Sequence, residues 1–337
     1  MTHSKKSGNG YKKINVSYIR YKDKQESKAV LEYGYTGTRL NQLYLAFPDD
    51  VYIPDGRNAG KVEYIHGGVS RNVVEDIANI ELRPTFLGIV DDSALGSDVI
   101  HKLQNHKVNT EYMLTIPNGM GTWLAVFDHR GDVAGSISQR PNLMPILDVL
   151  EESGDEIFEN ADSVVIEVDM DKEIVKKVVS LCEKFKKPLY GVVSNMSIAA
   201  ERRDFLRKFD CFICNQLEAG MFFSDDYSEK TPEALAEILA GCVKRANIPS
   251  MVVTMGGKGA VYADREGTYG ICPAKKVQVK DTTGAGDAFC AGVASGLTYG
   301  KTLEEAVEIG TRLAASVITS SENVCPRFLP AELGIDA

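Results

Sequence analysis

The stretch DTTGAGDAFCAGVASGL, from Asp281 to Leu297, joins a loop rich in glycine to an apolar segment of helical character. Glycines let a backbone approach a phosphate closely, and the first amides of a helix point at whatever lies in front of them. The helix dipole attracts the same anion. Asp287 falls in the first turn, where a carboxylate can accept a proton from a hydroxyl while neighbouring amides hold phosphate oxygens. The alternative is an Asp that only stabilises the helix dipole, by about 1 kcal/mol or less.

The segments that precede this stretch alternate between strand-like and helix-like patterns from about residue 161 onward. Short apolar runs such as Ser163–Val168 and Met251–Thr254 predict buried strands, and residues 172–187 carry apolar side chains at helical spacing. Residues 199–209 predict a further, polar helix. Strands that are apolar on both faces and alternate with helices indicate a parallel sheet covered on both sides. We therefore expect a doubly wound α/β domain.

The N-terminal part of the chain has a different pattern. Residues 40–66 and 110–140 contain alternating polar and apolar residues with turn sequences between them, and a hairpin turn is predicted near Asp128–Gly131. Half-buried strands of this kind do not suit the central sheet, so we expect a small β-sheet lid that is inserted twice. Residues 1–28 predict a disordered or loosely attached leader, and residues 29–337 the folded domain.

Four further motifs accompany the glycine loop, and together with it they resemble the ribokinase-like (PfkB-type) carbohydrate kinases. DTTGAGDAF resembles the C-terminal signature of that family, and the similarity spans roughly residues 34–326. The other motifs occur in the family's order, as HGGVSRN (His66–Asn72), PTFLGIVDDSALG (Pro84–Gly96), NQLE (Asn215–Glu218) and VTMGGKG (Val253–Gly259). The resemblance implies a doubly wound, mostly parallel sheet flanked by helices, with a small β-sheet lid. It also implies ATP-dependent phosphorylation of a hydroxyl of a sugar or nucleoside.

The resemblance also implies roles for matching residues. Asp287 would take the proton from the acceptor hydroxyl, and the amides of Gly284, Ala285 and Gly286 would form an anion hole. Glu218 would hold Mg²⁺ through water, with Asn215 near the phosphates, and Asp281 would lie beside a K⁺ site. The nucleotide site would be shaped by Thr254, Gly256, Gly257, Gly259 and Thr282. The acceptor would be faced by Gly67, Gly68, Arg71 and Asn72.

Within the family the sequence is most similar to the pseudouridine kinase subgroup, through GGVSRN, the segment Met120–Ser138 and SSENVCP. Three positions depart from that subgroup. Arg39 stands where an acid is usual, with Asn41 as the alternative under a shifted alignment. Gln139 ends a lid strand that ends in an acid in the subgroup. Ser194-Asn195 stands where Asp-Pro is usual. Losing acids favours an acceptor-rich or anionic substrate, so we expect pseudouridine to be a poor one. A kinase for an acidic sugar and a catalytically silent sugar- or nucleotide-binding regulator remain as alternatives.

Composition limits the partners and the location. A formal net charge of -9 argues against nucleic acid, and the absence of any run of about 18 apolar residues argues against a membrane span. The basic N-terminus has no apolar core behind it and does not predict a secretory signal. Seven scattered cysteines suit a reducing cytoplasm, and the C-x-x-C at Cys211–Cys214 lies in a buried strand pattern. By resemblance to the family, we expect a homodimer that forms through the lid.

Overall fold

The computed structural model describes residues 30–33, 41–129, 133–139, 141–193, 199–201 and 203–335. The predicted leader (residues 1–28), Arg39 and the pair Ser194-Asn195 lie outside the described residues. All seven cysteines are described, free and buried. No helix in the described part of the chain combines the length and the apolar character that a bilayer crossing needs.

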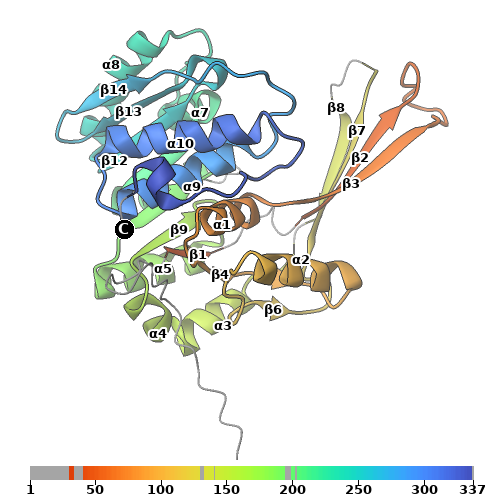
Figure 1. Cartoon of the computed structure of the whole chain (residues 1–337), viewed down its shortest axis with the longest axis horizontal. Helices are drawn as coiled ribbons and strands as arrows, with labels where there is room; N and C mark the ends of the chain where they lie inside the picture. Colours follow the sequence, from red (N-terminus) through yellow and green to blue (C-terminus); the bar gives the residue numbers. More distant parts are fainter. Residues whose placement is uncertain are drawn as a thin grey trace, which may run out of the picture.

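A sheet of eight strands forms the centre of the molecule (Figure 1). In spatial order its strands are β14 (Tyr269–Cys272), β13 (Ala260–Asp264), β12 (Ser250–Thr254), β11 (Cys211–Asn215), β10 (Leu189–Val192), β9 (Ser163–Glu167), β1 (Val30–Tyr33) and β4 (Thr85–Leu87). Pairing is parallel from β4 through β12, and β13 and β14 add antiparallel strands at one edge. The prediction of a mostly parallel sheet is confirmed, and the C-x-x-C cysteines lie in buried β11.

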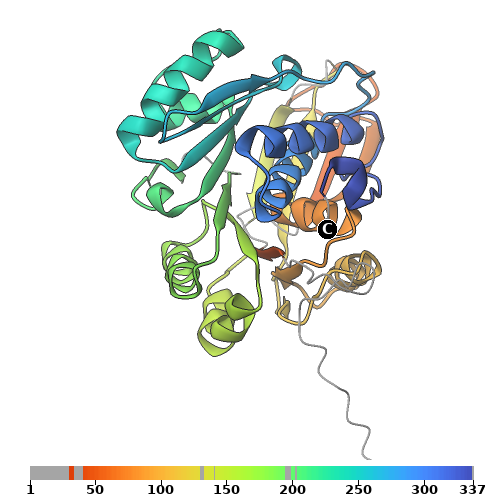
Figure 2. The same ribbon diagram turned by 60° about the vertical axis from the view of Figure 1, so that its left-hand side comes forward.

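Helices cover both faces of this sheet (Figure 2), as expected for a doubly wound α/β domain. Successive strand residues point to opposite faces, so Val164 and Ile166 belong to one core and Val165 to the other. The first core lies under α3 (Pro145–Glu152), α4 (Gly154–Glu159), α5 (Lys172–Phe185), α7 (Gln216–Phe223) and α8 (Pro232–Ala246). The second lies under α1 (Val69–Asn79), α9 (Ala285–Thr298) and α10 (Leu303–Val317).

Most predicted helices form, but the polar segment 199–209 is an exception. Its described part turns irregularly and contains one short 3₁₀ turn, η1 (Leu206–Lys208), rather than one continuous helix. Ala199 and Ala200 are helical, but turns follow them. Ala199, Leu206 and Phe209 are fully buried, and their spacing of seven and three residues would also fit one face of a continuous helix, so burial does not explain the break. The segment is instead held by neighbouring helices, because Arg203 donates to the Met221 oxygen at 3.3 Å and Arg207 to the Ala246 oxygen at 3.1 Å. The other short turns are η2 (Gly256–Lys258) and η3 (Pro330–Leu333).

A second, four-stranded sheet projects from the main domain (Figure 1) and corresponds to the lid. Its order is β3 (Gly60–Gly67), β2 (Asn41–Pro48), β7 (Gly121–Phe127) and β8 (Val133–Gln139). The predicted second insertion began near residue 110, but β6 (Leu114–Thr115) pairs instead with β5 (Ile89–Val90), next to α2 (Ala94–Asn105). The strands of this small sheet therefore start at Gly121 in the second segment.

Candidate active site

Helix α9 begins at a glycine that no other residue type could replace without strain. Gly284 is the N-cap residue with φ of 81°, and a Cβ there would lie 1.9 Å from the carbonyl oxygen of Asn323. Among the residues that the structure describes, no side chain caps this helix end. Of the three amides predicted to line an anion site, that of Ala285 already donates to the Thr282 oxygen at 3.3 Å. The positive end of the α9 dipole therefore faces no capping side chain, and the acidic residue in its first turn is Asp287.

Asp287 in the first turn of α9 meets Asn72 of α1, although 215 residues separate them. The Asn72 amide nitrogen donates to Asp287 Oδ2 at 2.5 Å. Asp287 is half-buried, and burial raises its pKa to about 7, while the Asn72 hydrogen bond and the positive charge of Arg71 act to lower it. A carboxyl that titrates near neutrality is suited to general base catalysis.

Helix α1 carries an unusual number of buried polar side chains. The buried Glu167 of β9 accepts hydrogen bonds from the amide of Ser70, at 3.0 Å, and from its hydroxyl. This carboxylate caps the start of α1 from a neighbouring strand and complements the helix dipole. One turn after Asn72, the fully buried Asp76 accepts from the Cys325 amide at 2.5 Å, and Asn79 donates to the Cys325 oxygen at 2.7 Å. Helix α1 therefore holds the chain that follows α10 against the site.

The residues predicted to face the acceptor lie at the junction of the lid and α1. Gly67 ends β3 and is buried, and Gly68 is the N-cap of α1 with φ of 115°. Strand pairing places Asn41 opposite Gly67. The Arg71 side chain is only 1% exposed and forms a buried ion pair with Glu75. Its guanidinium also contacts Asn72, the neighbouring residue that is predicted to face the acceptor. A contact of Arg71 with the acceptor stays a prediction.

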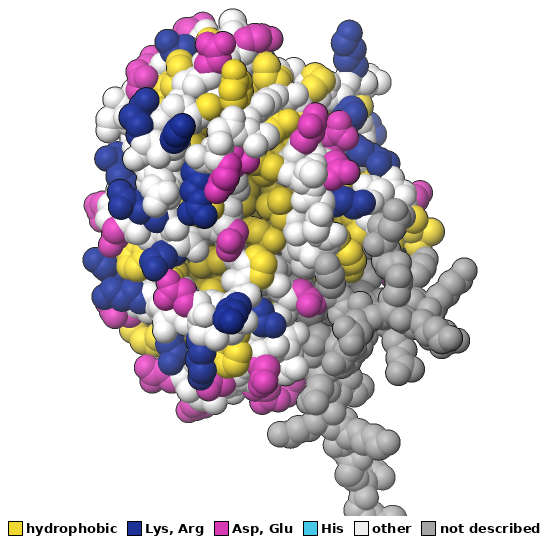
Figure 3. All heavy atoms as spheres, turned by 90° about the vertical axis from the view of Figure 1, so that its left-hand side faces the viewer, with side chains coloured by type: hydrophobic (Ala, Val, Ile, Leu, Met, Phe, Trp, Pro, Cys, Tyr) yellow, Lys and Arg dark blue, Asp and Glu magenta, His cyan; other side chains and the backbone are white. Residues whose placement is uncertain are grey.

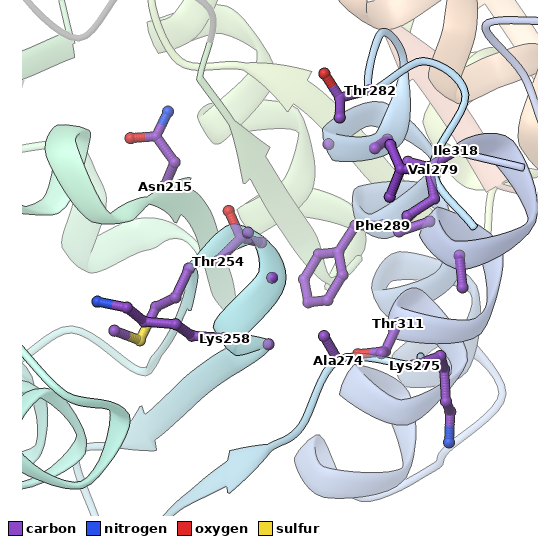
Figure 4. Close-up of a pocket in the computed structure, with 18 of the residues that line it drawn as sticks. Asn215, Thr254, Lys258, Ala274, Lys275, Val279, Thr282, Phe289, Thr311 and Ile318 are labelled. Atoms are coloured by element: carbon purple, nitrogen blue, oxygen red, sulfur yellow. The ribbon is translucent and has the colours of Figure 1, made fainter. Parts of the chain in front are cut away.

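A large cavity opens beside α9, with a volume of about 1520 Å³. Asn215, Thr254 and Lys258 lie on one side of it, and Thr282, Val279 and Phe289 lie across from them (Figure 4). The cavity contacts eight residues of the predicted sites, namely Asn215, Thr254, Gly256, Gly257, Gly259, Thr282, Ala285 and Gly286. Its described lining includes Lys258, Lys275 and Lys276 but no Asp or Glu, although the chain has a net charge of -9. These features fit an anionic ligand with an apolar base.

The glycines of this cavity divide into two kinds. A Cβ at Gly256, Gly257 or Gly286 would meet no atom within 4 Å, so protein packing does not exclude a side chain there. By contrast, Gly259 has φ of 98°, and a Cβ there would lie 2.1 Å from the Cys272 oxygen. The fold therefore requires Gly259, whereas Gly257 and Gly286 keep space open on the cavity side.

Glu218 and Asn215 form a reciprocal cap at the start of α7. Asn215 Oδ1 accepts from the Glu218 amide at 2.9 Å, and Glu218 Oε2 accepts from the Asn215 amide at 2.7 Å. Burial raises the pKa of Glu218, and the neighbouring charge of Asp169 acts in the same direction. One carboxylate oxygen is engaged in the cap, and the second oxygen of this donor fits Mg²⁺ held through water.

Asp281 is exposed and closes its own turn, because its Oδ1 accepts from the Thr283 amide at 2.8 Å. This hydrogen bond lowers the pKa of Asp281. Within the described residues, no group of three or more His, Cys, Asp or Glu side chains gathers into a metal site. A K⁺ site beside Asp281 stays a prediction.

The fold and this site define a kinase for small molecules that bear a hydroxyl group. The chain belongs to the pfkB family of carbohydrate kinases, which it matches over residues 29–325. It is 35% identical over 280 residues to a guanosine-inosine kinase of Exiguobacterium acetylicum, covering 82% of this chain and 91% of that protein. It is 25% identical over 252 residues to the pseudouridine kinase of Escherichia coli, covering 74% and 79%.

Solved structures agree on the fold. A ribokinase of Arabidopsis thaliana, determined with ribose and ATP, superposes with a TM-score of 0.79 at 19% identity and covers 91% of this chain and 98% of its own. The ribokinase-like fold predicted from the sequence is therefore confirmed.

Three residues near the site were missed by sequence reasoning. Glu167, Glu75 and Asp76 are buried carboxylates whose partners come from distant segments or from an adjacent helical turn. Only the Arg71–Glu75 spacing of four residues gave a signal, and on an exposed helix the same spacing is a common surface ion pair. A fourth residue, Asn323, lies in SSENVCP, a segment that resembles the subgroup but does not itself indicate a site residue.

We predict that Gly286→Ala leaves the fold intact but weakens use of ATP. The substitution meets open space and adds a good helix former, so stability stays the same or rises by at most about 1 kcal/mol. The new methyl group occupies the cavity side of α9, so kcat/KM for ATP should fall about tenfold or more. Steady-state kinetics and urea unfolding measure both effects.

The matched control is Gly259→Ala, which should lower the free energy of unfolding by about 1–3 kcal/mol because of backbone strain and overlap with Cys272. A Gly286→Ala enzyme with unchanged kinetics for ATP would show that no ligand approaches this amide.

Proposed function

We propose that this enzyme transfers the terminal phosphoryl group of ATP to a hydroxyl of a purine nucleoside, with Asp287 as the base. The observation that carries the proposal is the position of Asp287, a carboxyl with a pKa of about 7 beside the uncapped N-terminus of α9 and the cavity. The purine nucleoside is supported by the 35% identity to a guanosine-inosine kinase.

In the proposed mechanism the nucleotide lies in the cavity, with its phosphates toward the start of α9. The lysines of the cavity offset the negative charge of the phosphates, and the amides of Gly284 and Gly286 face the transferring group. Asp287 accepts the proton of the acceptor hydroxyl as that oxygen bonds to the terminal phosphorus. The bond from this phosphorus to the bridging oxygen breaks, and ADP leaves. Asn72 and the Gly67–Gly68 pair hold the acceptor beside Asp287.

Mg²⁺ would be held by Glu218 through water, and when bound it would neutralise charge on the nucleotide phosphates. This assignment is supported by the donor chemistry of Glu218 and by its position at the carboxyl end of β11, next to a residue of the cavity. K⁺ near Asp281 is supported by family resemblance alone.

We also propose that the lid pairs with a second copy of the chain. Val62, Leu124 and Ile137 are 67%, 41% and 72% exposed, and strand register places them on one face of the small sheet. Apolar side chains gathered on a projecting sheet favour a protein partner. A cytoplasmic location also remains a proposal, supported by seven free cysteines.

The first prediction concerns the base. Asp287→Asn should lower kcat by about 10²–10⁴-fold, measured as acceptor-dependent release of ADP, and chelation of Mg²⁺ should abolish the wild-type rate. Because only the ionised carboxylate accepts a proton, wild-type kcat/KM should fall as the pH drops below about 7.

Stability provides the control for this variant. At pH 8 the folded protein holds a charge that burial disfavours, and the unfolded chain does not bear that cost. Asp287→Asn removes the charge, so its melting temperature at pH 8 should not fall below that of the wild type. A variant that turns over normally would show that Asp287 is not the base.

The second prediction concerns the acceptor. Guanosine or inosine should give a kcat/KM at least about tenfold above that of pseudouridine, a ratio that one altered pocket contact can produce. A panel of nucleosides, ribose and acidic sugars, assayed for ADP release, measures this ratio. Preference for pseudouridine would contradict the assignment, and preference for an acidic sugar would favour that alternative. Nucleotide binding without turnover of any acceptor would favour the regulator.

The third prediction concerns assembly. Ile137→Asp places a charge on the exposed apolar face of the lid and should convert a dimer to a monomer in sedimentation velocity at micromolar concentration. Tyr269→Asp, at a 50% exposed position of β14 far from the lid, serves as the control and should remain dimeric. A wild-type protein that sediments as a monomer would contradict the proposal.

A further inference from the structure

A continuous row of charged and polar side chains runs through the protein interior from α2 to Asp287. Lys102 Nζ of α2 and His106 Nε2 of its C-cap lie 3.2 and 3.5 Å from Glu75 Oε1, and Glu75 Oε2 pairs with the Arg71 guanidinium. Arg71 and Glu75 are each 1% exposed, whereas Lys102 and His106 reach the surface. The Arg71 guanidinium in turn donates from its second terminal nitrogen to Asn72 Oδ1.

These contacts fix which way the Asn72 amide points. A guanidinium has donors only, so the atom of Asn72 that faces Arg71 has to be the oxygen. The side-chain nitrogen of Asn323 donates to the same oxygen at 3.2 Å. The amide nitrogen is thereby directed at Asp287, to which it donates at 2.5 Å. With the amide reversed, its nitrogen would face two donors and its oxygen would face a carboxylate.

We propose that the buried Arg71–Glu75 pair is a positioning device for the base, which orients Asn72 and holds a positive charge behind Asp287. This inference rests on the proposed function. It assigns Arg71 a role through Asn72 and Asp287, apart from the acceptor contact expected from the sequence. Glu75 keeps the guanidinium in place, and Lys102 and His106 hold Glu75 from the other side.

The charge of Arg71 acts on the ionisation of Asp287 as well as on its position. Burial raises the pKa of Asp287, and the Arg71 charge lowers it, so removing that charge should raise it further. The other titratable groups of this row are Asp76 and Glu75 on α1, Lys102 on α2 and His106 at the C-cap of α2. Burial raises the pKa of Asp76 well above its usual range, so a negative charge there is disfavoured.

The experiment compares pH profiles of kcat/KM for two variants. In Arg71→Met combined with Glu75→Leu, apolar side chains replace the buried pair, an exchange that proteins often tolerate. Its acid limb should move up by about 1 pH unit, because an opposite charge near a carboxyl lowers the pKa by about 1–3 units. Its plateau above pH 9 should also lie about 10²-fold below wild type, because Asn72 is released. In Arg71→Lys the positive charge stays, but the two-pronged guanidinium that contacts both Glu75 and Asn72 is lost. The plateau of kcat/KM should therefore fall, while the acid limb of its pH profile should move little.

Arg327→Met is the matched control, because this arginine forms an exposed ion pair with Glu81, 3.2 Å away, near the end of α1. It should have the wild-type profile. The KM for ATP should stay unchanged in all variants, because neither Arg71 nor Glu75 lines the nucleotide cavity. The inference would be overturned if the acid limb of the kcat/KM profile were unmoved in the double variant and the plateau of kcat/KM were unchanged in Arg71→Lys. A wild-type enzyme that releases no ADP with any acceptor would instead contradict the proposed function, before any Arg71 variant is tested.

Discussion

The site depends on the contact between two helix starts, those of α1 and α9, which lie far apart in the sequence. The hydrogen bond from Asn72 to Asp287 joins these helices, and each is held there by a different constraint. Glu167 caps α1 from strand β9, and Gly284 allows α9 to begin against the backbone of Asn323. The Cys325 backbone forms hydrogen bonds with both Asp76 and Asn79, and these bonds fix the segment after α10 to α1. A shift of any one of these three contacts would move the carboxylate relative to the cavity.

Burial of the carboxylates suits the site to acid–base chemistry, and it is also energetically unfavourable. Carboxylates taken out of water are unfavourable unless they are paired or hydrogen-bonded, and the row from Glu75 to Asp287 supplies a donor for each. The remaining desolvation raises the pKa of Asp287 toward neutrality, which suits a base. The surface is less specialised, and one face carries Lys and Arg side chains interspersed with Asp and Glu in the part that the structure describes (Figure 3). The cavity is better suited to a negatively charged ligand, because its described lining carries lysines without carboxylates.

Much of the fold could be predicted because local signals and tertiary packing agree. The apolar run at Ser163–Val168 forms β9, and the side chains of Thr231 and Thr302 cap the starts of α8 and α10, as threonine commonly does at a helix N-terminus. The glycine loop at 281–287 indicated the start of α9 and the site beside it. Residues 199–209 were predicted wrongly as one helix, because the contacts of Arg203 and Arg207 with α7 and α8 are not visible in the local sequence. The burial of Arg71 could not be predicted, since an arginine next to a ligand motif is typical of a binding residue and its four-residue spacing to Glu75 is equally common on exposed helices.

The central claim is that Asp287 deprotonates the acceptor while the start of α9 faces the phosphoryl group. A crystal structure with ADP, Mg²⁺, aluminium fluoride and guanosine tests it most directly, since this mixture mimics the transferring group between donor and acceptor. The account predicts an acceptor oxygen about 2.6–3.2 Å from a carboxylate oxygen of Asp287, with the fluoride ligands at the amides of Gly284 and Gly286. An acceptor hydroxyl bound out of reach of Asp287, with another side chain as its proton acceptor, would contradict it.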